Sequence, residues 1–453
     1  MRGWLRWTDR RLSSGPVLPA KTAFLALALC LPLLASCGHA PKAVEPVQQN
    51  HTYDYPFDNP WAATVLGTPE ALKLTFASAV EPEQRHLEIF PEREKPEGFW
   101  YHDGLRYSVL LQDHPAPLVF VIAGTGASDR ARYMLSLGRT LHAAGLHVAL
   151  LPSPTHANFI VSASTTRLPG RADTDAADLY RVMRLIDDEI RAEVGVTGYH
   201  LTGYSLGAWH AAFTAKLDAE QGAFGFKRVL LINPPLSLYN AIEAIDAMLV
   251  RGIPNGIDGL DAFLDGTVAQ LSAIYQSTDA LELADADFII KTYQRLRPSD
   301  DRLAAAIGLA FRLSTANMVF TSDVMTNAGY IFPRDQQFDS TTPLLDYWPV
   351  AIRTSLLDYF KDIYAAFYLK QNPGLSRQDL IDQSSLASIG DWLSRADGVW
   401  LLTNRDDIIL PPGDLDALQR LFGARSKIYP SGGHLGNLEH RAVLSFIAGF
   451  FTE

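Results

Sequence analysis

Short apolar runs alternate with amphipathic stretches over the first half of the chain. Five runs predict buried strands: Tyr107–Leu111, Pro117–Ala123, His147–Pro152, Tyr199–Thr202 and Val229–Ile232. The stretches between them predict helices: Ala131–Ala144, Ala176–Val194 and Ala208–Leu217. In the longest of these helices, apolar side chains recur at helical spacing from Leu179 to Ile190. This alternation predicts an α/β protein with a mostly parallel, doubly wound sheet that is covered by helices on both faces.

The alternation stops at Ser237 and resumes only near the C-terminus. Residues 237–392 contain helical stretches, of which Val350–Lys370 is the clearest, and no convincing buried strand. Strand and helix patterns then alternate again over Gly398–Thr403, Leu415–Leu421, Ser426–Tyr429 and Arg441–Phe451. The sequence therefore predicts a core in two parts, residues 61–236 and 393–453, with residues 237–392 inserted as a helical cap. The segment from Trp61 to Arg106 has a mixed pattern that assigns no element.

The N-terminus has the pattern of an export signal. A basic lead precedes the apolar run Ala23–Ala35, whose length falls within the roughly 7–15 residues of a signal-peptide core. The run ends in Leu-Ala-Ser-Cys, which resembles the lipobox of bacterial lipoproteins and would make Cys37 the lipidated residue. Residues 1–36 are then a signal peptide. The polar, Pro-rich residues 37–60 would be the lipidated Cys and a tether. A plain secretory signal with a chance cysteine is the alternative.

Cysteine usage and charge narrow the possible partners. The chain has 453 residues and two cysteines, and Cys30 lies inside the predicted signal, so no internal disulfide remains. The net charge of −11 becomes more negative once the basic lead is removed, which argues against nucleic acid as a partner. The expected membrane partner is reached through the lipid anchor rather than through charge. This predicts a cell-envelope location, and Gly38 after the anchor favours the outer membrane where the cell has one.

One motif carries nucleophile chemistry. Gly203-Tyr204-Ser205-Leu206-Gly207 has the form G-x-S-x-G and lies between a predicted strand and a predicted Ala-rich helix. A serine on such a strained turn is exposed, and glycine at both flanks lets strand and helix approach closely. The alternative is a structural Gly-rich turn. In this context we expect Ser205 to be a catalytic nucleophile.

A serine nucleophile needs a general base and an acid that orients it. His434 lies in the Gly-rich loop Gly432–Gly436 after the last predicted strand, where it can reach the sheet edge. His440 falls in an apparent helix, and His156 is expected to be a pocket or structural residue. Two adjacent acids, Asp406 and Asp407, follow the strand Gly398–Thr403 and compete for the third role.

The chain from about residue 107 onwards, without the cap, resembles the α/β-hydrolase superfamily. The resemblance implies the chain order nucleophile, acid, base, which is Ser205, Asp407, His434 here. It favours Asp407 over Asp406 because many relatives carry the acid four positions before a proline, as Asp407 is before Pro411. It also implies an oxyanion hole made by the backbone N–H groups of Leu206 and of a residue in the loop Ala123-Gly124-Thr125-Gly126, where Thr125 is the candidate donor.

These residues predict a membrane-anchored serine hydrolase that cleaves an acyl ester through an acyl-enzyme. A large apolar cap suits a small-molecule acyl substrate, and the aromatic stretch Tyr347–Tyr368 could wall its pocket or simply form a buried cap helix. Thioester, amide or peptide cleavage, and a non-catalytic binding lipoprotein, are the alternatives. No metal-binding or nucleotide-binding motif is present, so no cofactor or metal is expected. The oligomeric state stays open.

Overall fold

The computed structural model describes residues 51–76, 80–277 and 287–452. The predicted signal peptide, Cys37 and the start of the predicted tether lie outside these residues. The chain divides into two units, and residues 253–288 fall in the smaller one together with residues 1–40. Its described part holds a short 3₁₀ turn, Gly256–Gly259, and the helix α8 (Leu260–Ser277). The sheet, its flanking helices and the rest of the cap belong to the larger unit.

Eight strands of the described chain form one sheet in the order β1-β2-β4-β3-β5-β6-β7-β8. Their bounds are β1 Glu83–Leu87, β2 Leu105–Leu110, β3 Ala116–Ile122, β4 His147–Leu151, β5 Val196–Tyr204, β6 Arg228–Ile232, β7 Val399–Asn404 and β8 Ser426–Tyr429. Strand β2 runs antiparallel to both of its neighbours, whereas all pairs from β4 to β8 are parallel. This mostly parallel sheet, with its crossover helices, confirms the predicted α/β-hydrolase fold.

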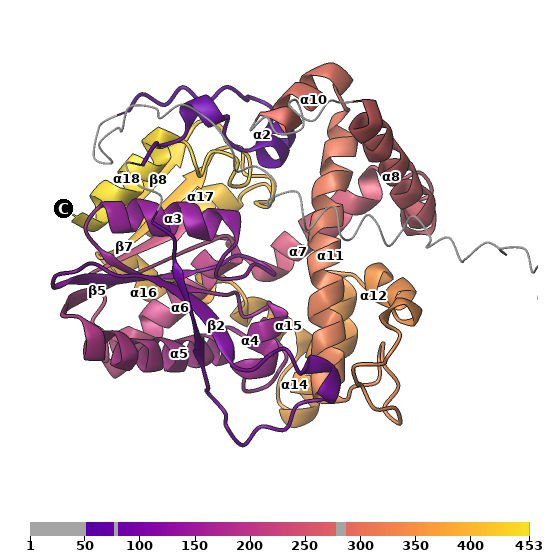
Figure 1. Ribbon diagram of the computed structural model, residues 1–453, viewed down its shortest axis with the longest axis horizontal. Helices are drawn as coiled ribbons and strands as arrows, with labels where there is room; N and C mark the ends of the chain where they lie inside the picture. Colours follow the sequence, from indigo (N-terminus) through magenta and orange to yellow (C-terminus); the bar gives the residue numbers. More distant parts are fainter. Residues whose placement is uncertain (1–50, 77–79, 278–286, 453) are drawn as a thin grey trace, which may run out of the picture. The chain divides into compact units, whose positions relative to one another are not determined.

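The sheet is covered on both faces because its central strands are apolar on both. Leu118, Phe120 and Ile122 of β3 pack into the cluster formed with α5 and α6, whereas Val119 and Val121 pack with α3 and α18. Figure 1 shows α3 and α18 on one face and α5 on the other. The helices of the core are α3 Arg132–Ala143, α4 Ala157–Ser162, α5 Ala172–Glu193, α6 Leu206–Gln221, α16 Gly390–Arg395, α17 Asp414–Phe422 and α18 Arg441–Thr452.

Residues 51–60, the second part of the predicted tether, belong to the folded body. Tyr55 is buried, and the Tyr53 hydroxyl donates a hydrogen bond to the Ser431 carbonyl oxygen at 2.5 Å. The Asn59 side chain then caps helix α2 (Pro60–Leu66) by accepting the Ala62 N–H. The polar composition suggested a linker, but the aromatic side chains within it find partners near the C-terminus. The prediction of a tether up to residue 60 is therefore wrong for this stretch.

The cap leaves the core after β6 and returns before β7. Among the described residues it holds helices and no named strand: α7 Leu238–Arg251, α8, α10 Phe288–Leu296, α11 Asp300–Thr326, α12 Trp348–Arg353, α13 Leu356–Asp358, α14 Ala365–Gln371 and α15 Arg377–Gln383. Its two ends meet in an antiparallel bridge between Ser237 and Ser385. Beyond this bridge Leu386, Ile389 and Leu393 pack into the core cluster beside α6. The cap thus ends near Ser385, earlier than the predicted residue 392.

The predicted helix Val350–Lys370 is broken in the structure. Helix α12 ends at Arg353, and Ser355 starts a new helix by accepting the Asp358 N–H in a capping box. A π-helical segment, Tyr359–Tyr364, then leads into α14. Continuous apolar spacing hid this break, because Thr354 and Ser355 favour helix ends through side-chain hydrogen bonds.

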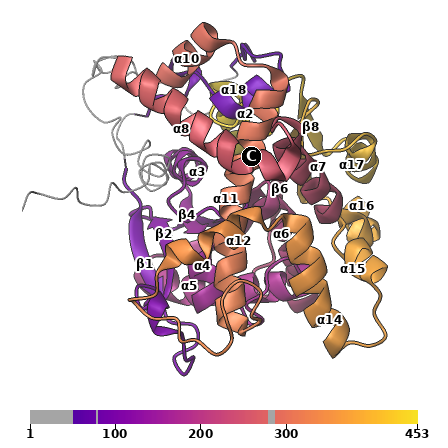
Figure 2. The ribbon, with the colours of Figure 1, turned by 90° about the vertical axis from the view of Figure 1, so that its right-hand side faces the viewer.

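Helix α11 is, among the described residues, the one helix long and apolar enough to cross a membrane. In its most apolar stretch 61% of the residues are buried within the fold, as in the central helix of a folded domain. A Cβ on its Gly308 would lie 2.4 Å from the Leu249 backbone nitrogen of α7, so the two helices cross in close contact. Figure 2 shows α11 and its neighbour α12 from the side.

Candidate active site

Ser205 occupies the turn between strand β5 and helix α6. Its backbone has φ +54° and ψ −125°, a region that non-glycine residues rarely adopt. The flanking glycines make the turn possible. A Cβ on Gly207 would lie 2.1 Å from the Ile122 carbonyl oxygen, and one on Gly203 would lie 2.4 Å from the Gly207 oxygen. The Ser205 N–H donates to the Ile232 oxygen at 2.8 Å, which ties the turn to the neighbouring strand.

The structure brings His434 and Asp407 to this turn. His434 Nε2 lies 2.9 Å from Ser205 Oγ, and His434 Nδ1 lies 3.0 and 3.1 Å from the two Asp407 carboxylate oxygens. All three side chains are buried. With the proton on Nδ1 facing the carboxylate, Nε2 presents its lone pair to the serine hydroxyl. The arrangement can therefore withdraw a proton from Ser205 Oγ.

The two competing acids have different partners. Asp407 accepts hydrogen bonds from the Asn233 side-chain amide at 2.7 Å and from the Ile409 N–H at 3.2 Å, in addition to facing His434. Asp406 instead accepts the backbone N–H groups of Gly432 and Gly433, and burial raises the pKa of its carboxyl group. The geometry thus puts Asp407 against the imidazole and Asp406 under the loop that carries it.

The other two histidines considered from the sequence, His156 and His440, form hydrogen bonds with residues outside the Ser205 site. His156 caps helix α4, where its Nδ1 accepts the Asn158 N–H at 3.3 Å, and burial lowers its pKa. His440 lies just before α18 rather than inside a helix. It is buried, with Nε2 3.0 Å from an Asp54 carboxylate oxygen, and burial lowers its pKa in spite of that partner. Both have structural partners.

The two predicted oxyanion donors lie beside Ser205. Leu206 is the first residue of α6, so its backbone N–H has no partner within the helix. Thr125 follows β3, and both residues line the same pocket as Ser205. The next amide in that loop, Gly126 N–H, donates to Thr155 Oγ1 at 2.8 Å and is already used. The positions fit the prediction, and the role of the two N–H groups stays a proposal.

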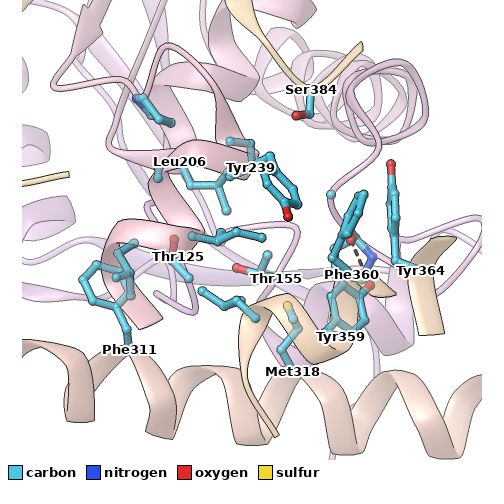
Figure 3. Close-up of a pocket in the computed structure, with 18 of the residues that line it drawn as sticks. Thr125, Thr155, Leu206, Tyr239, Phe311, Met318, Tyr359, Phe360, Tyr364 and Ser384 are labelled. Carbon is cyan, nitrogen blue, oxygen red and sulfur yellow. Dashed lines mark hydrogen bonds between the residues drawn. The ribbon is translucent and has the colours of Figure 1, made fainter. Parts of the chain in front are cut away.

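An apolar pocket opens beside the serine. The core contributes Thr125, Thr155, Pro169, Gly170, Ser205, Leu206, Pro235 and Ile409, and the cap contributes Leu238, Tyr239, Ala241, Ile242, Ile245, Phe311, Met318, Leu356, Tyr359, Phe360, Tyr364, Leu380 and Ser384. Among the described residues, none that lines this pocket carries a charged side chain. In Figure 3, Tyr359, Phe360 and Tyr364 stand together at the end away from Thr125 and Leu206.

In the part of the chain that the structure describes, no cluster of acidic, His or Cys side chains could hold a metal ion.

The aromatic stretch Tyr347–Tyr368 serves both roles considered from the sequence. Tyr359, Phe360 and Tyr364, all in the π-helical segment, line the pocket. Tyr347 instead packs against Phe332 within the cap, and Phe367 lies outside the pocket lining. The Tyr359 hydroxyl donates to the Pro169 oxygen at 2.9 Å, which fixes the segment to the core.

Sequence reasoning missed two residues that support the site. Asn233 follows β6 with φ +49° and donates to Asp407, and an asparagine directly after a buried strand was the available signal. Thr64 of α2 accepts the backbone N–H of His434 at 2.9 Å. Nothing in the local sequence around Thr64 points to a partner so far along the chain.

No protein-family model and no curated protein matches this sequence. Solved structures do. A carboxyl esterase from Bacillus coagulans matches at 13% identity and a TM-score of 0.38, over 81% of this chain and 98% of its own. The thioesterase domain from the curacin biosynthetic pathway matches at 13% identity and a TM-score of 0.35, over 82% and 99%. A meta-cleavage product hydrolase from Pseudomonas fluorescens matches at 15% identity and a TM-score of 0.38, over 77% and 94%. Values this low carry no information about the substrate, so the chemistry rests on the chain's own residues.

Proposed function

We propose that this chain is a serine hydrolase that cleaves carboxylic esters through an acyl-enzyme intermediate. The observation that carries the proposal is the continuous hydrogen-bonded series from Asp407 through His434 to Ser205 at the edge of an apolar pocket. A scaffold that only bound ligands would have no use for a buried imidazole aligned between a carboxylate and a strained serine.

In the proposed reaction, Ser205 Oγ attacks the ester carbonyl carbon while His434 Nε2 takes its proton. The carbonyl oxygen becomes an oxyanion, which the N–H groups of Leu206 and Thr125 would stabilise. Collapse of this intermediate expels the alcohol, which receives the proton from His434. Water then attacks the carbonyl carbon of the acyl-enzyme while His434 Nε2 takes a proton from it. Ser205 Oγ leaves, receives that proton from His434, and the carboxylic acid is released.

The pocket favours an ester with an apolar acyl group. The described residues of its walls carry Leu, Ile, Met and aromatic side chains and no charge, so a buried hydrocarbon chain gains roughly 25 cal/mol per Å² of apolar surface removed from water. A charged amino-acid or peptide side chain would lose hydration there without a partner. Thioesters present the same acyl group, and the substrate screen below distinguishes them.

We further propose that a lipid on Cys37 holds the enzyme at the bacterial cell envelope, facing the periplasm or the exterior, with the outer membrane favoured. The support is the signal-like pattern of residues 1–36 and the lipobox-like ending at Cys37. Acyl chains on one cysteine bind a bilayer stably, so no charged docking surface is required.

A fluorophosphonate probe tests the nucleophile directly. The purified chain should label stoichiometrically and hydrolyse p-nitrophenyl esters in a series of graded acyl length, with matched thioesters and anilides run beside them. Ser205→Ala should abolish labelling and turnover while leaving the melting temperature nearly unchanged. The control Ser384→Ala, a pocket serine whose hydroxyl donates to the Ile381 oxygen, should label normally. Full activity in folded Ser205→Ala would refute the proposed function.

A further inference from the structure

The segment Tyr53–Thr68, here called the N-terminal strap, lies against the loop that carries His434. Its contacts reach along that loop. The Tyr53 hydroxyl donates to the Ser431 oxygen at 2.5 Å, and Thr68 Oγ1 donates to the Gly436 oxygen at 3.0 Å. The Asn437 side chain donates back to the Tyr53 hydroxyl at 2.9 Å. The strap therefore binds the loop both before and after the position of the histidine.

Thr64 makes the contact nearest to the proposed chemistry. Its hydroxyl donates to the Pro60 oxygen of its own helix at 2.7 Å, which orients the oxygen lone pairs outward. The same oxygen accepts the backbone N–H of His434 at 2.9 Å. Because His434 is buried, loss of this acceptor would leave its amide without a partner, which is unfavourable for an N–H group that water does not reach. The loop would then move to satisfy that amide.

The fit between loop and strap is too close for side chains larger than hydrogen. A Cβ on Gly433 would lie 2.3 Å from the Pro60 oxygen, and one on Gly436 would lie 2.1 Å from the Ala63 oxygen. Gly433 also has φ +55°, a conformation that favours glycine. Gly433 and Gly436 thus allow the loop to pack closely on α2, and Asp406 accepts the Gly432 and Gly433 N–H groups.

We propose that Thr64 is a positioning residue for His434 and that the N-terminal strap is a working part of the active site. This inference rests on the proposed function of Ser205 and His434. Thr64 never touches substrate. It fixes the height of His434 above Ser205, and a misplacement on the order of 1 Å in such a contact can cost about a hundredfold in rate.

The test compares Thr64→Val, which keeps the shape and removes the acceptor, with Thr64→Ser, which keeps the oxygen. On a short soluble ester, Thr64→Val should lower kcat about ten- to a hundredfold with KM changed less than about twofold. Thr64→Ser should restore kcat to within about threefold of the parent. The control is Thr140→Val in α3, where the hydroxyl also donates to the oxygen four residues earlier, at 2.7 Å, but the helix lies on the core face formed with α18. It should lower the melting temperature and leave kcat unchanged.

Two outcomes would overturn the inference: a Thr64→Val enzyme with parental kcat, or a Thr64→Ser enzyme as slow as Thr64→Val. If Thr64→Val does not fold, Tyr53→Phe decides, because it removes the hydrogen bond to the Ser431 oxygen from a partly exposed ring. That variant should lower kcat about three- to tenfold at constant KM, and unchanged kcat counts against the strap. Failure of the parent chain to react with the probe or with any ester would instead refute the proposed function itself.

Discussion

Ser205 adopts a backbone conformation that its neighbours have to maintain. A non-glycine residue at such angles costs on the order of 1–3 kcal/mol, which the surrounding structure must offset. Three contacts do so: the Ser205 N–H on the Ile232 oxygen, the contact of Gly207 with Ile122, and that of Gly203 with Gly207. The strain is local, but it is stabilised by two adjacent strands. The turn and the strands β3, β5 and β6 therefore act together to hold the Ser205 hydroxyl in place.

The two neighbouring acids should differ in their effect on turnover. Asp407→Asn keeps the shape but favours the wrong imidazole tautomer, so kcat should fall on the order of 10⁴-fold. Asp406→Asn keeps one oxygen for the loop amides and should cost less than about tenfold, or 1.4 kcal/mol. Steady-state turnover of both variants on one ester measures the difference. A large loss of turnover in Asp406→Asn beside near-parental turnover in Asp407→Asn would show that Asp406, and not Asp407, orients the imidazole.

At the scale of elements, the π-helical segment Tyr359–Tyr364 sets the far wall of the pocket. Phe360→Ala should enlarge that end and move the preferred acyl group to longer chains, with the kcat/KM for short esters falling less than about tenfold. The measurement is kcat/KM across the graded ester series. Phe367→Ala, a partly buried aromatic outside the pocket lining, is the matched control and should leave the preference unchanged. Equal losses at every acyl length in Phe360→Ala would assign the ring to stability alone.

Elements with a strong apolar pattern could be predicted from the sequence, and elements defined by distant contacts could not. The buried strands β3, β4, β6 and β7 follow largely apolar runs, and their predicted bounds, like those of the partly exposed edge strand β8, agree to within about two residues. Strand β1 was missed because it is an edge strand, polar in sequence and exposed over most of its length. The aromatic residues before α2 looked like a linker because their partners lie near the C-terminus.

The same division holds within the site. Glycine-rich local motifs identify Ser205 and His434 as candidates. The choice of Asp407 over Asp406 depends instead on which of the two side chains faces the imidazole. Thr64 and Asn233 act only through residues remote in sequence, so no local pattern identifies their partners.

At the scale of the whole molecule, the proposed anchor can be tested by a single change. Cys37→Ser should move the protein from the detergent phase to the aqueous phase in a detergent partition, because the predicted mature chain contains no other cysteine. Its turnover of a soluble ester should equal that of the parent, since the strap begins well after Cys37. Partition of Cys37→Ser with the parent in the detergent phase would refute lipidation at this position.

The cap leaves and re-enters the chain of the core at one point, although it also contacts the core elsewhere, as where Tyr359 bonds to Pro169. The Leu386 N–H donates to the Leu236 oxygen at 2.7 Å and the Leu238 N–H donates to the Ser384 oxygen at 3.1 Å, so the chain departs and returns at the same point. The entropy of closing such a loop grows only slowly with its length, so a longer or shorter insert at this point changes the cost of closing the loop very little. Ser205, Asp407 and His434 all lie outside the inserted segment, which runs from Ser237 to Ser385. A chain with a different insert at this point would keep the three residues of the proposed series and give them a different pocket, and its insert would have to support α2 as Leu303 of the present cap does.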